Sequence, residues 1–218
     1  MHYPTEKSYL DIGANFGLRS IYYASQGREC YLFEPNKKCN VITQRLIEEN
    51  NFTNVHLVPK IVGNTNSIQK FYLSKSTYVS TIIKERSNID NDFTETIEEE
   101  QITVDDFVTQ HHIADQVAIL KIDVEGYEYA VLLGARKLLA KPNKTFIMEV
   151  LFDSTEKSNI FQFLLELNYK FFYILSHPSK LILELLSERG FKNKAIDVLC
   201  TNDVDLINIL SEKYIVRK

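Results

Sequence analysis

The chain has 218 residues, of which 44% are hydrophobic and 25% charged, and its formal net charge is −4. This length allows one domain with a substantial core, so we expect residues 1–218 to form a single domain. The mildly acidic composition argues against the nonspecific grip on phosphates that clustered Lys and Arg provide, and we expect no nucleic-acid partner.

Short apolar runs alternate with helical patterns along the chain. The first run, SYLDI, predicts a strand, and the segment after it predicts a helix that ends at Gly27. The next predicted helix, 36–51, has apolar residues at Val41, Ile42, Leu46 and Ile47, the spacing of one helix face. The predicted strands are 8–12, 29–35, 55–64, 117–126, 145–151, 169–175 and 195–202, and the predicted helices are 17–27, 36–51 and 126–139.

A polar stretch from Ser74 to Glu100 separates the third predicted strand from the fourth. Its acid run is typical of a solvated face or a mobile loop. Because long loops in compact domains often serve a binding site, a lid or substrate segment is the alternative.

Strands that alternate with helices are joined by right-handed crossovers, which build a parallel sheet with helices on both faces. We therefore expect an α/β fold. In such a sheet, ligands bind beyond the carboxyl ends of the strands, near the point where the strand order reverses. The end of the first predicted strand is a candidate for this position.

The sequence GANFG follows that strand and predicts a tight turn at its carboxyl end. We expect Gly13 and Gly17 to let the backbone approach a ligand without a Cβ atom in the way. Asn15 belongs to the few residue types that tolerate a left-handed conformation. The helix that starts near Gly17 then directs its amide donors at the ligand.

The acid before this turn indicates the kind of ligand. A dinucleotide site favours the spacing G-x-G-x-x-G, whereas this turn has G-x-x-x-G preceded by Asp11. A carboxylate repels a pyrophosphate and attracts a cation. S-adenosylmethionine carries a sulfonium and an α-ammonium group, so we expect it as the cofactor and disfavour an NAD-dependent oxidoreductase.

A second acid, Glu34, ends the next predicted strand 23 residues after Asp11. An acid about 20 residues beyond the first turn is placed to accept both ribose hydroxyls of a nucleoside. Taken alone, Glu34 could be a turn acid before Pro35, and the GANFG turn could be a plain strand-to-helix connection. The two features together, at this spacing, favour a nucleoside site.

The chain resembles the FkbM-type S-adenosylmethionine-dependent methyltransferases in six segments, which are LDIGANFG, FEPN, IVGN, TVDDFV, LKIDVEGYEYAVLLGA and FIMEV. The resemblance spans residues 9–201, and KIDVEG is its most specific segment. It implies a Rossmann-like, seven-stranded, mostly parallel sheet with an antiparallel last strand and helices on both faces. It also implies O-methyl transfer to a hydroxyl of a small molecule, sugar or glycan.

The resemblance carries roles to individual residues. It implies that the first motif lines the methionine part of the cofactor and that Glu34 binds the ribose. It places the IVGN segment near the adenine and the acids of KIDVEG near the methyl group. The cofactor-binding residues implied in this way are Asp11, Gly13, Asn15, Gly17, Glu34, Val62, Gly63 and Asp123.

Three acids are candidates for the transfer chemistry itself. Asp123 ends the strand predicted at 117–126, Glu125 follows it, and Glu149 ends FIME on the next strand. Transfer to a hydroxyl requires a base, and carboxylates held close together raise one pKa and so prepare one. Alternatively, two or three of these oxygens hold Mg²⁺, which would acidify the hydroxyl. We do not favour the metal.

Residues beside these acids have simpler interpretations. We interpret Lys121 as an ion-pair partner of one of the acids. Glu128 is placed to stabilise the start of the following helix, where acids are favoured. We expect Tyr78, Tyr127 and Phe152 to form an apolar wall for the substrate.

The three cysteines, Cys30, Cys39 and Cys200, are odd in number and match no zinc-site spacing. We interpret them as reduced thiols that fill the core of a cytoplasmic protein. No apolar run approaches the ~20 residues of a membrane span.

Two functions remain open at this point. The first is an S-adenosylmethionine-dependent O-methyltransferase. The second is a binding module that keeps the methyltransferase fold and holds the cofactor or a partner without turnover, since fold does not fix function.

Overall fold

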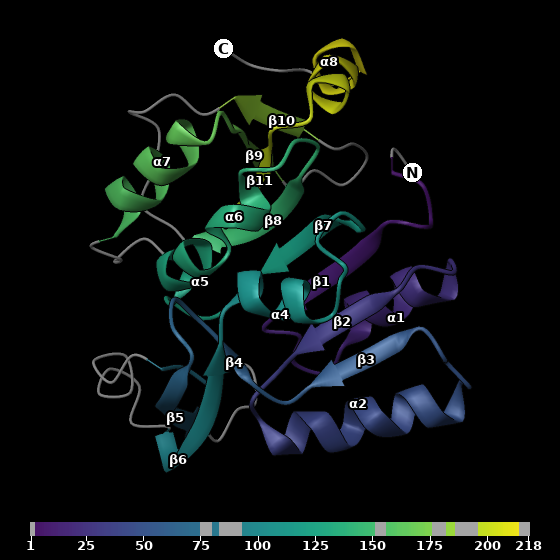
Figure 1. Ribbon diagram of the computed structural model, residues 1–218, viewed down its shortest axis with the longest axis vertical. Helices are drawn as coiled ribbons and strands as arrows, with labels where there is room; N and C mark the ends of the chain where they lie inside the picture. Colours follow the sequence, from purple (N-terminus) through teal and green to yellow (C-terminus); the bar gives the residue numbers. More distant parts are fainter. Residues whose placement is uncertain are drawn as a thin grey trace.

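The computed structural model describes residues 3–74, 80–82, 93–150, 156–175, 182–185 and 196–213. Its main feature is an eight-stranded sheet with the strand order β10-β9-β11-β8-β7-β1-β2-β3 (Figure 1). Its strands are β1 (Ser8–Ile12), β2 (Cys30–Phe33), β3 (Val55–Val58), β7 (Val117–Ile122), β8 (Thr145–Val150), β9 (Lys170–Leu175), β10 (Ile182–Leu185) and β11 (Ile196–Thr201).

The directions of these strands confirm the predicted fold class. Strands β3, β2, β1, β7 and β8 run parallel to one another, and β11 is antiparallel to both β8 and β9. Strand β10 adds an antiparallel edge that the sequence did not predict. The chain builds the sheet outward from β1 to β3 and then returns to β7 on the other side of β1, so the strand order reverses between β1 and β7.

A second, three-stranded sheet contains β4 (Ile61–Val62), β5 (Ser67–Ser74) and β6 (Phe93–Ile102) in the order β4-β6-β5. The acid run predicted to be a solvated face or a mobile loop lies on β6, so the solvated face fits it and the loop does not. There Ile97 faces Phe71 and packs with the small sheet's core, while Glu95, Glu98 and Glu100 are exposed and Glu99 is half-buried. The charged residues on β6 masked the alternation of side chains between two faces that is typical of a strand. Residues 75–79 and 83–92, to which the lid interpretation also applied, lie outside the described residues.

Helices cover both faces of the main sheet, as predicted. The helices are α1 (Leu18–Ser25), α2 (Lys37–Glu49), α4 (Val104–Gln110), α5 (Glu128–Gly134), α6 (Arg136–Leu139), α7 (Lys157–Glu166) and α8 (Val204–Lys213). Alternate residues of β1 enter two different cores: Tyr9 packs with Ala24 of α1, and Leu10 lies in the core that contains Phe107 of α4 and Val131 of α5. The predicted helix 126–139 is interrupted at Ala135.

The predicted apolar face of α2 is wrong in its first half, whereas Leu46 and Ile47 are half-buried and Ile47 packs against the core that contains Tyr9 and Ala24. Val41 and Ile42 are exposed, and the buried residues of the helix are Cys39, Asn40 and Thr43. The helix therefore packs through a small, partly polar face. Its position against the site explains this choice, because Thr43 donates to the carbonyl of Asn15 and Cys39 lies 3.8 Å from the Asn15 side chain.

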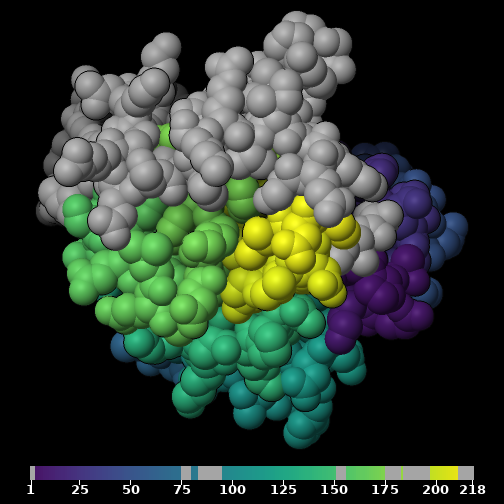
Figure 2. Space-filling model, turned by 90° about the horizontal axis from the view of Figure 1, so that it is seen from above, coloured from purple at the N-terminus to yellow at the C-terminus, as the bar shows by residue number. Residues whose placement is uncertain are grey.

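The amino-terminal segment lies beside α8, as Figure 2 shows for the purple and yellow residues. Tyr3 contacts Thr145 of β8 at 2.6 Å, and the buried guanidinium of Arg28 donates to the carbonyls of Tyr3, Pro4 and Lys7.

Two further expectations concern the whole chain. The three cysteines are buried and unbridged, in agreement with their predicted role in the core. Among the described residues, no helix combines the length and apolarity that crossing a bilayer requires. The assignment of residues 1–218 to one domain stays a prediction.

Candidate functional site

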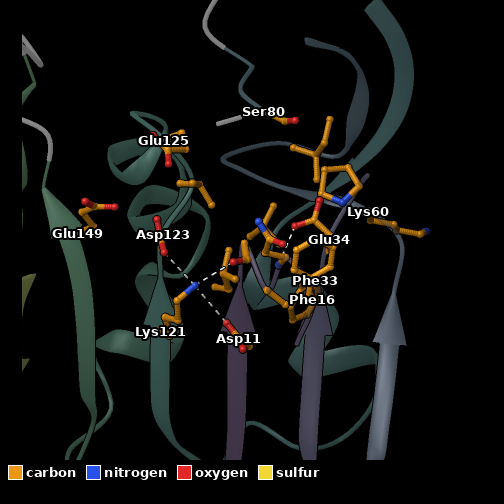
Figure 3. A pocket seen from close by; sticks show the side chains of 18 of the residues that line it. Asp11, Phe16, Phe33, Glu34, Lys60, Ser80, Lys121, Asp123, Glu125 and Glu149 are labelled. Atoms are coloured by element: carbon orange, nitrogen blue, oxygen red, sulfur yellow. Dashed lines mark hydrogen bonds and ion pairs between the residues drawn. The ribbon is translucent and has the colours of Figure 1, made fainter. Parts of the chain in front are cut away.

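A cavity of about 360 Å³ opens at the carboxyl ends of β1, β2 and β7, where the strand order reverses (Figure 3). Most of the predicted site residues line it. On one side these are Asp11, Gly13, Asn15, Glu34 and Val62, and on the other Asp123, Glu125 and Glu149. Gly17 and Gly63 lie behind the wall and do not line it.

The GANFG segment forms the predicted tight turn after β1. The amides of Gly13 and Ala14 both donate to the carbonyl of Phe33, which ties the turn to the end of β2. Asn15 has a φ of 52°, so its predicted left-handed conformation is confirmed. Helix α1 begins directly after Gly17, and none of the described side chains caps its first turn.

The expected reason for the two glycines is wrong. A Cβ atom at Gly13 would lie 1.8 Å from the carbonyl oxygen of Asp123, and one at Gly17 would lie 2.7 Å from Leu32. Both spaces are filled by protein rather than left for a ligand. The glycines instead allow the turn to pack against the end of β7 and the core beneath α1.

Asp11 lies at the base of the cavity and is almost fully buried. One carboxylate oxygen accepts a hydrogen bond of 2.6 Å from Ser20 of α1, and the other lies 3.4 Å from the ammonium of Lys121. Its charge is therefore partly balanced, and it remains on the cavity wall.

Glu34 joins the ends of β1 and β2. Its two oxygens accept one backbone hydrogen bond each, from the amide of Asn36 at 2.8 Å and from that of Asn15 at 2.9 Å. Burial raises the pKa of this carboxyl, and the two amides oppose the rise. The carboxylate is thus held rigidly at the cavity wall, with further lone pairs to accept other donors.

Beyond Glu34 the wall becomes apolar. Val62 lies in it as predicted, together with Phe33, Pro35 and Ile61. Gly63 sits behind this wall, with its carbonyl group close to Gly134. A Cβ atom added at Gly134 would lie 1.9 Å from the carbonyl oxygen of Gly63. The small sheet and the segment after β5 complete this side through Phe71, Ser80 and Ile82.

The three acids meet at the opposite rim, as predicted (Figure 3). Asp123, Glu125 and Glu149 each offer an oxygen within 4.8 Å of the others. Burial, a hydrogen bond with Asp123 and the charges of Asp123, Glu125 and Asp197 raise the pKa of Glu149 to about 7. Carboxylates so close together favour retention of a proton.

Of the two residues beside the rim, Glu128 takes the structural role expected of it: it accepts a hydrogen bond of 2.8 Å from the amide of Gly126, which supports the start of α5. Tyr127 does not line the cavity, in contrast to its predicted place in an apolar substrate wall. Its hydroxyl instead donates to Gln101 of β6 at 3.1 Å. Tyr78 and Phe152 lie outside the described residues.

Lys121 links the two sides of the cavity. Its ammonium lies 2.8 Å from the carbonyl oxygen of Gly13, 3.2 Å from Asp123 and 3.4 Å from Asp11. The predicted ion pair with an acid is confirmed, and the sequence did not indicate the contact with the turn. The sequence does contain a signal for the pairing with Asp123, because side chains alternate along β7 and Lys121 therefore lies on the same face as Asp123.

A second cavity of about 540 Å³ adjoins the first and shares Leu18, Arg19 and Lys121 with it. Tyr9, Tyr22, Ile119 and other largely apolar side chains line it. Sequence reasoning missed this cavity, because its wall is assembled from α1, the sheet face and residues near both ends of the described chain.

The family model described as the methyltransferase FkbM domain matches residues 11–171. Among solved structures, the chain is similar to methyltransferase FkbM from Methylobacillus flagellatus KT, with a TM-score of 0.60, 13% identity and coverage of 92% of this chain and 44% of that chain. It thus spans less than half the length of that structure, which shares its fold.

Two further similarities are more distant. An rRNA methylase from Streptococcus thermophilus has a TM-score of 0.48, 12% identity and coverage of 91% of this chain and 88% of that chain. Precorrin-6y C5,15-methyltransferase from Geobacter metallireducens GS-15 has a TM-score of 0.47, 10% identity and coverage of 92% and 83%. No curated protein matches the chain.

Proposed function

Because the chain belongs to the methyltransferase FkbM family, we propose that it transfers a methyl group from S-adenosylmethionine to a hydroxyl of a small molecule, sugar or glycan. The observation that carries this proposal is the composition of one cavity. It holds the turn after β1, the carboxylate of Glu34 and a rim of three acids within reach of a single bound molecule.

The cavity residues fit the chemical parts of the cofactor. The uncapped first turn of α1 offers amide donors to a carboxylate, and the buried charge of Asp11 attracts a cation. Glu34 would accept the ribose hydroxyls, and Phe33, Pro35, Ile61 and Val62 would pack on the adenine. When bound, the cofactor supplies an activated methyl group on a sulfonium.

The acid rim supports oxygen as the acceptor atom. A neutral hydroxyl must lose its proton on methylation, and Glu149 with a pKa of about 7 is suited to take it. Asp123 would orient Glu149 and the acceptor. The net charge of −4 favours a small molecule or glycan over nucleic acid as the partner.

Calorimetry and a turnover assay test the proposal together. We expect S-adenosylmethionine and S-adenosylhomocysteine to bind and NAD not to bind. With a panel of hydroxylated small molecules and sugars, S-adenosylhomocysteine should form. Binding without turnover on any of them would favour the silent binding module, and no binding of either nucleoside would refute the proposal.

Glu34→Gln is expected to weaken S-adenosylhomocysteine binding at least about ten-fold. Hydrogen bonds to a charged group are worth about 1.5–3 kcal/mol, and about 1.4 kcal/mol is a factor of ten. The glutamine amide keeps the size of the side chain but accepts hydrogen bonds through one oxygen only. The two carboxylate oxygens of Glu34 already accept from Asn15 and Asn36, so the variant has fewer acceptors left for the ribose hydroxyls. Calorimetry measures the change.

A ligand lacking the ribose hydroxyls separates binding from support of the turn. If Glu34 holds these hydroxyls, Glu34→Gln should affect the 2′,3′-dideoxy analogue of S-adenosylhomocysteine much less than the parent compound. An equal loss for both ligands would mean that Glu34 acts only on the turn. Glu29→Gln, at the exposed start of β2, is the matched control and should change neither affinity.

A further inference from the structure

We propose that Lys121 is a positioning residue of the transferase site, whose ammonium fixes the turn after β1 to Asp123 and so sets the distance between the cofactor and the acid rim. The catalytic role of Lys121 rests on the proposed function. The contacts of Lys121 are given by the geometry alone.

The ammonium is matched to its surroundings. A lysine has three donor hydrogens, and three oxygens surround this one, from Gly13, Asp11 and Asp123, at distances of 2.8, 3.4 and 3.2 Å. The side chain is about 10% exposed, so water screens these contacts little. Its stem is confined on β7 between β1 and β8, which leaves the ammonium few alternative positions.

The three oxygens belong to two functional halves. Gly13 and Asp11 belong to the end of β1, where the methionine part of the cofactor would lie. Asp123 belongs to the acid rim and follows β7 directly. The two segments also touch through the amide of Asp123, which donates to the carbonyl of Ile12 at 3.0 Å. Lys121 adds the side-chain link to this backbone link.

The charges around Lys121 explain why a cation is needed there. Asp11 faces it from β1, Asp123 follows it on its own strand, and Glu149 lies on β8 beside Asp123. Its charge also lowers the pKa of Glu34 at the end of β2. Arg19 of α1 shares the cavity wall with Lys121. Without the ammonium, Asp11 and Asp123 would lose their shared cation and repel each other.

The arrangement assigns unequal roles to the two acids of the rim. Asp123 is paired with the ammonium of Lys121 and accepts a hydrogen bond from its neighbour. Glu149 shares a hydrogen bond with Asp123 and becomes the group that takes up and releases a proton. Lys121 acts through Asp123 and need not touch the substrate.

Lys121→Met tests the proposal, because it keeps the length of the side chain and removes the charge. We expect S-adenosylhomocysteine affinity to fall at least ten-fold in calorimetry. We also expect the amide hydrogen of Asp123, which donates to the carbonyl of Ile12, to exchange with solvent at least ten-fold faster in the protein without cofactor, as followed by NMR. Lys137→Met, on the exposed surface of α6, should change neither.

A chemical rescue covers the case in which Lys121→Met folds poorly. Lys121→Cys treated with 2-bromoethylamine regains an ammonium at nearly the original length. The native thiols are buried, and burial raises the pKa of Cys30 and Cys39 to about 12, so they should react slowly. Treated wild-type protein controls for them. Rescue should restore the affinity and the exchange rate of the Asp123 amide to within about two-fold of wild type.

Two results would overturn the role of Lys121. One is a folded Lys121→Met protein with wild-type affinity and a wild-type exchange rate of the Asp123 amide. The other is a fully modified Lys121→Cys protein that recovers neither property, since side-chain charge would then not be the cause. If wild-type protein binds no S-adenosylhomocysteine, the proposed function fails, while amide exchange at Asp123 still tests the link that Lys121 makes.

Discussion

Glu149→Gln is expected to lower turnover by about 10²–10⁴-fold, the usual cost of losing a general base. Glu149 meets Asp123 and Glu125 at the rim, and its pKa is raised to about 7 by burial and by these neighbours. Near neutral pH it can therefore both accept a proton and release it. Initial rates of S-adenosylhomocysteine formation, with an acceptor found by the panel assay, measure the loss.

The direction of the pKa shift fixes two pH dependences of opposite sign. Below pH 7 Glu149 carries a proton and cannot accept another, so the wild-type rate should rise with pH through about 7 and then level off. Stability behaves the other way. The pKa is higher in the folded than in the unfolded chain, so the contribution is complete below about pH 4.5 and is lost as the pH rises through about 7.

Glutamine resembles the protonated side chain, so Glu149→Gln should be less active and more stable. Above pH 7 we expect a gain of about 1–2 kcal/mol over wild type, a figure reduced for partial exposure, and little gain at pH 4.5. Urea unfolding at both pH values measures it. Equal stabilities at pH 8 would contradict the raised pKa, and a wild-type rate in Glu149→Gln would remove this residue from the chemistry.

Asp123→Asn and a chelator separate the possible roles of the rim. As an orienting group, Asp123 should matter for turnover and little for cofactor affinity. Were the three acids to hold Mg²⁺, the wild-type rate would vanish with chelator and return with the metal; we expect no such effect. An Asp123→Asn protein that turns over like wild type, with and without chelator, would leave the rim a structural feature.

The central strands and the turn were predictable from sequence because their signals are local. A short apolar run ending in an acid, followed by GANFG, allows few structures other than a strand and a tight turn. The observed β1 has the predicted bounds. The first half of the α2 face was mispredicted and strand β6 was missed because tertiary contacts overrode local patterns: Thr43 packs toward Asn15, and the acids on β6 mask its alternation.

The site was predictable to the extent that its residues follow strand ends. Asp11, Glu34, Asp123 and Glu149 stand at or beside the carboxyl ends of four neighbouring strands, so topology alone brings them together. The cavity's other wall comes from the small sheet and the segment around Ser80, whose pairing is not local. The threefold contact of Lys121 depends on where a long side chain ends, which sequence spacing does not determine.

Gly13→Ala is expected to destabilise the fold by about 3–5 kcal/mol and to abolish detectable cofactor binding. A single methyl group at this position would lie 1.8 Å from the carbonyl oxygen of Asp123 and 2.8 Å from its carbonyl carbon. Both neighbours are backbone atoms next to β7, so neither can rotate away. Relief requires the end of β1 to move away from β7, which would pull the Gly13 carbonyl from Lys121 and shift the turn relative to Glu34.

Gly27→Ala provides a matched control for this variant. Gly27 also has a positive φ, +83° against +77° at Gly13, but a Cβ atom there meets nothing within 4 Å. Its alanine variant should therefore be destabilised by about 1–2 kcal/mol, the cost of a left-handed backbone conformation alone, and should bind cofactor normally. The difference between the two variants in urea unfolding measures the destabilisation caused by the steric clash. Calorimetry on the fraction of Gly13→Ala that remains folded tests the site. If Gly13→Ala costs no more than Gly27→Ala, the close approach of the turn to β7 is not what requires this glycine.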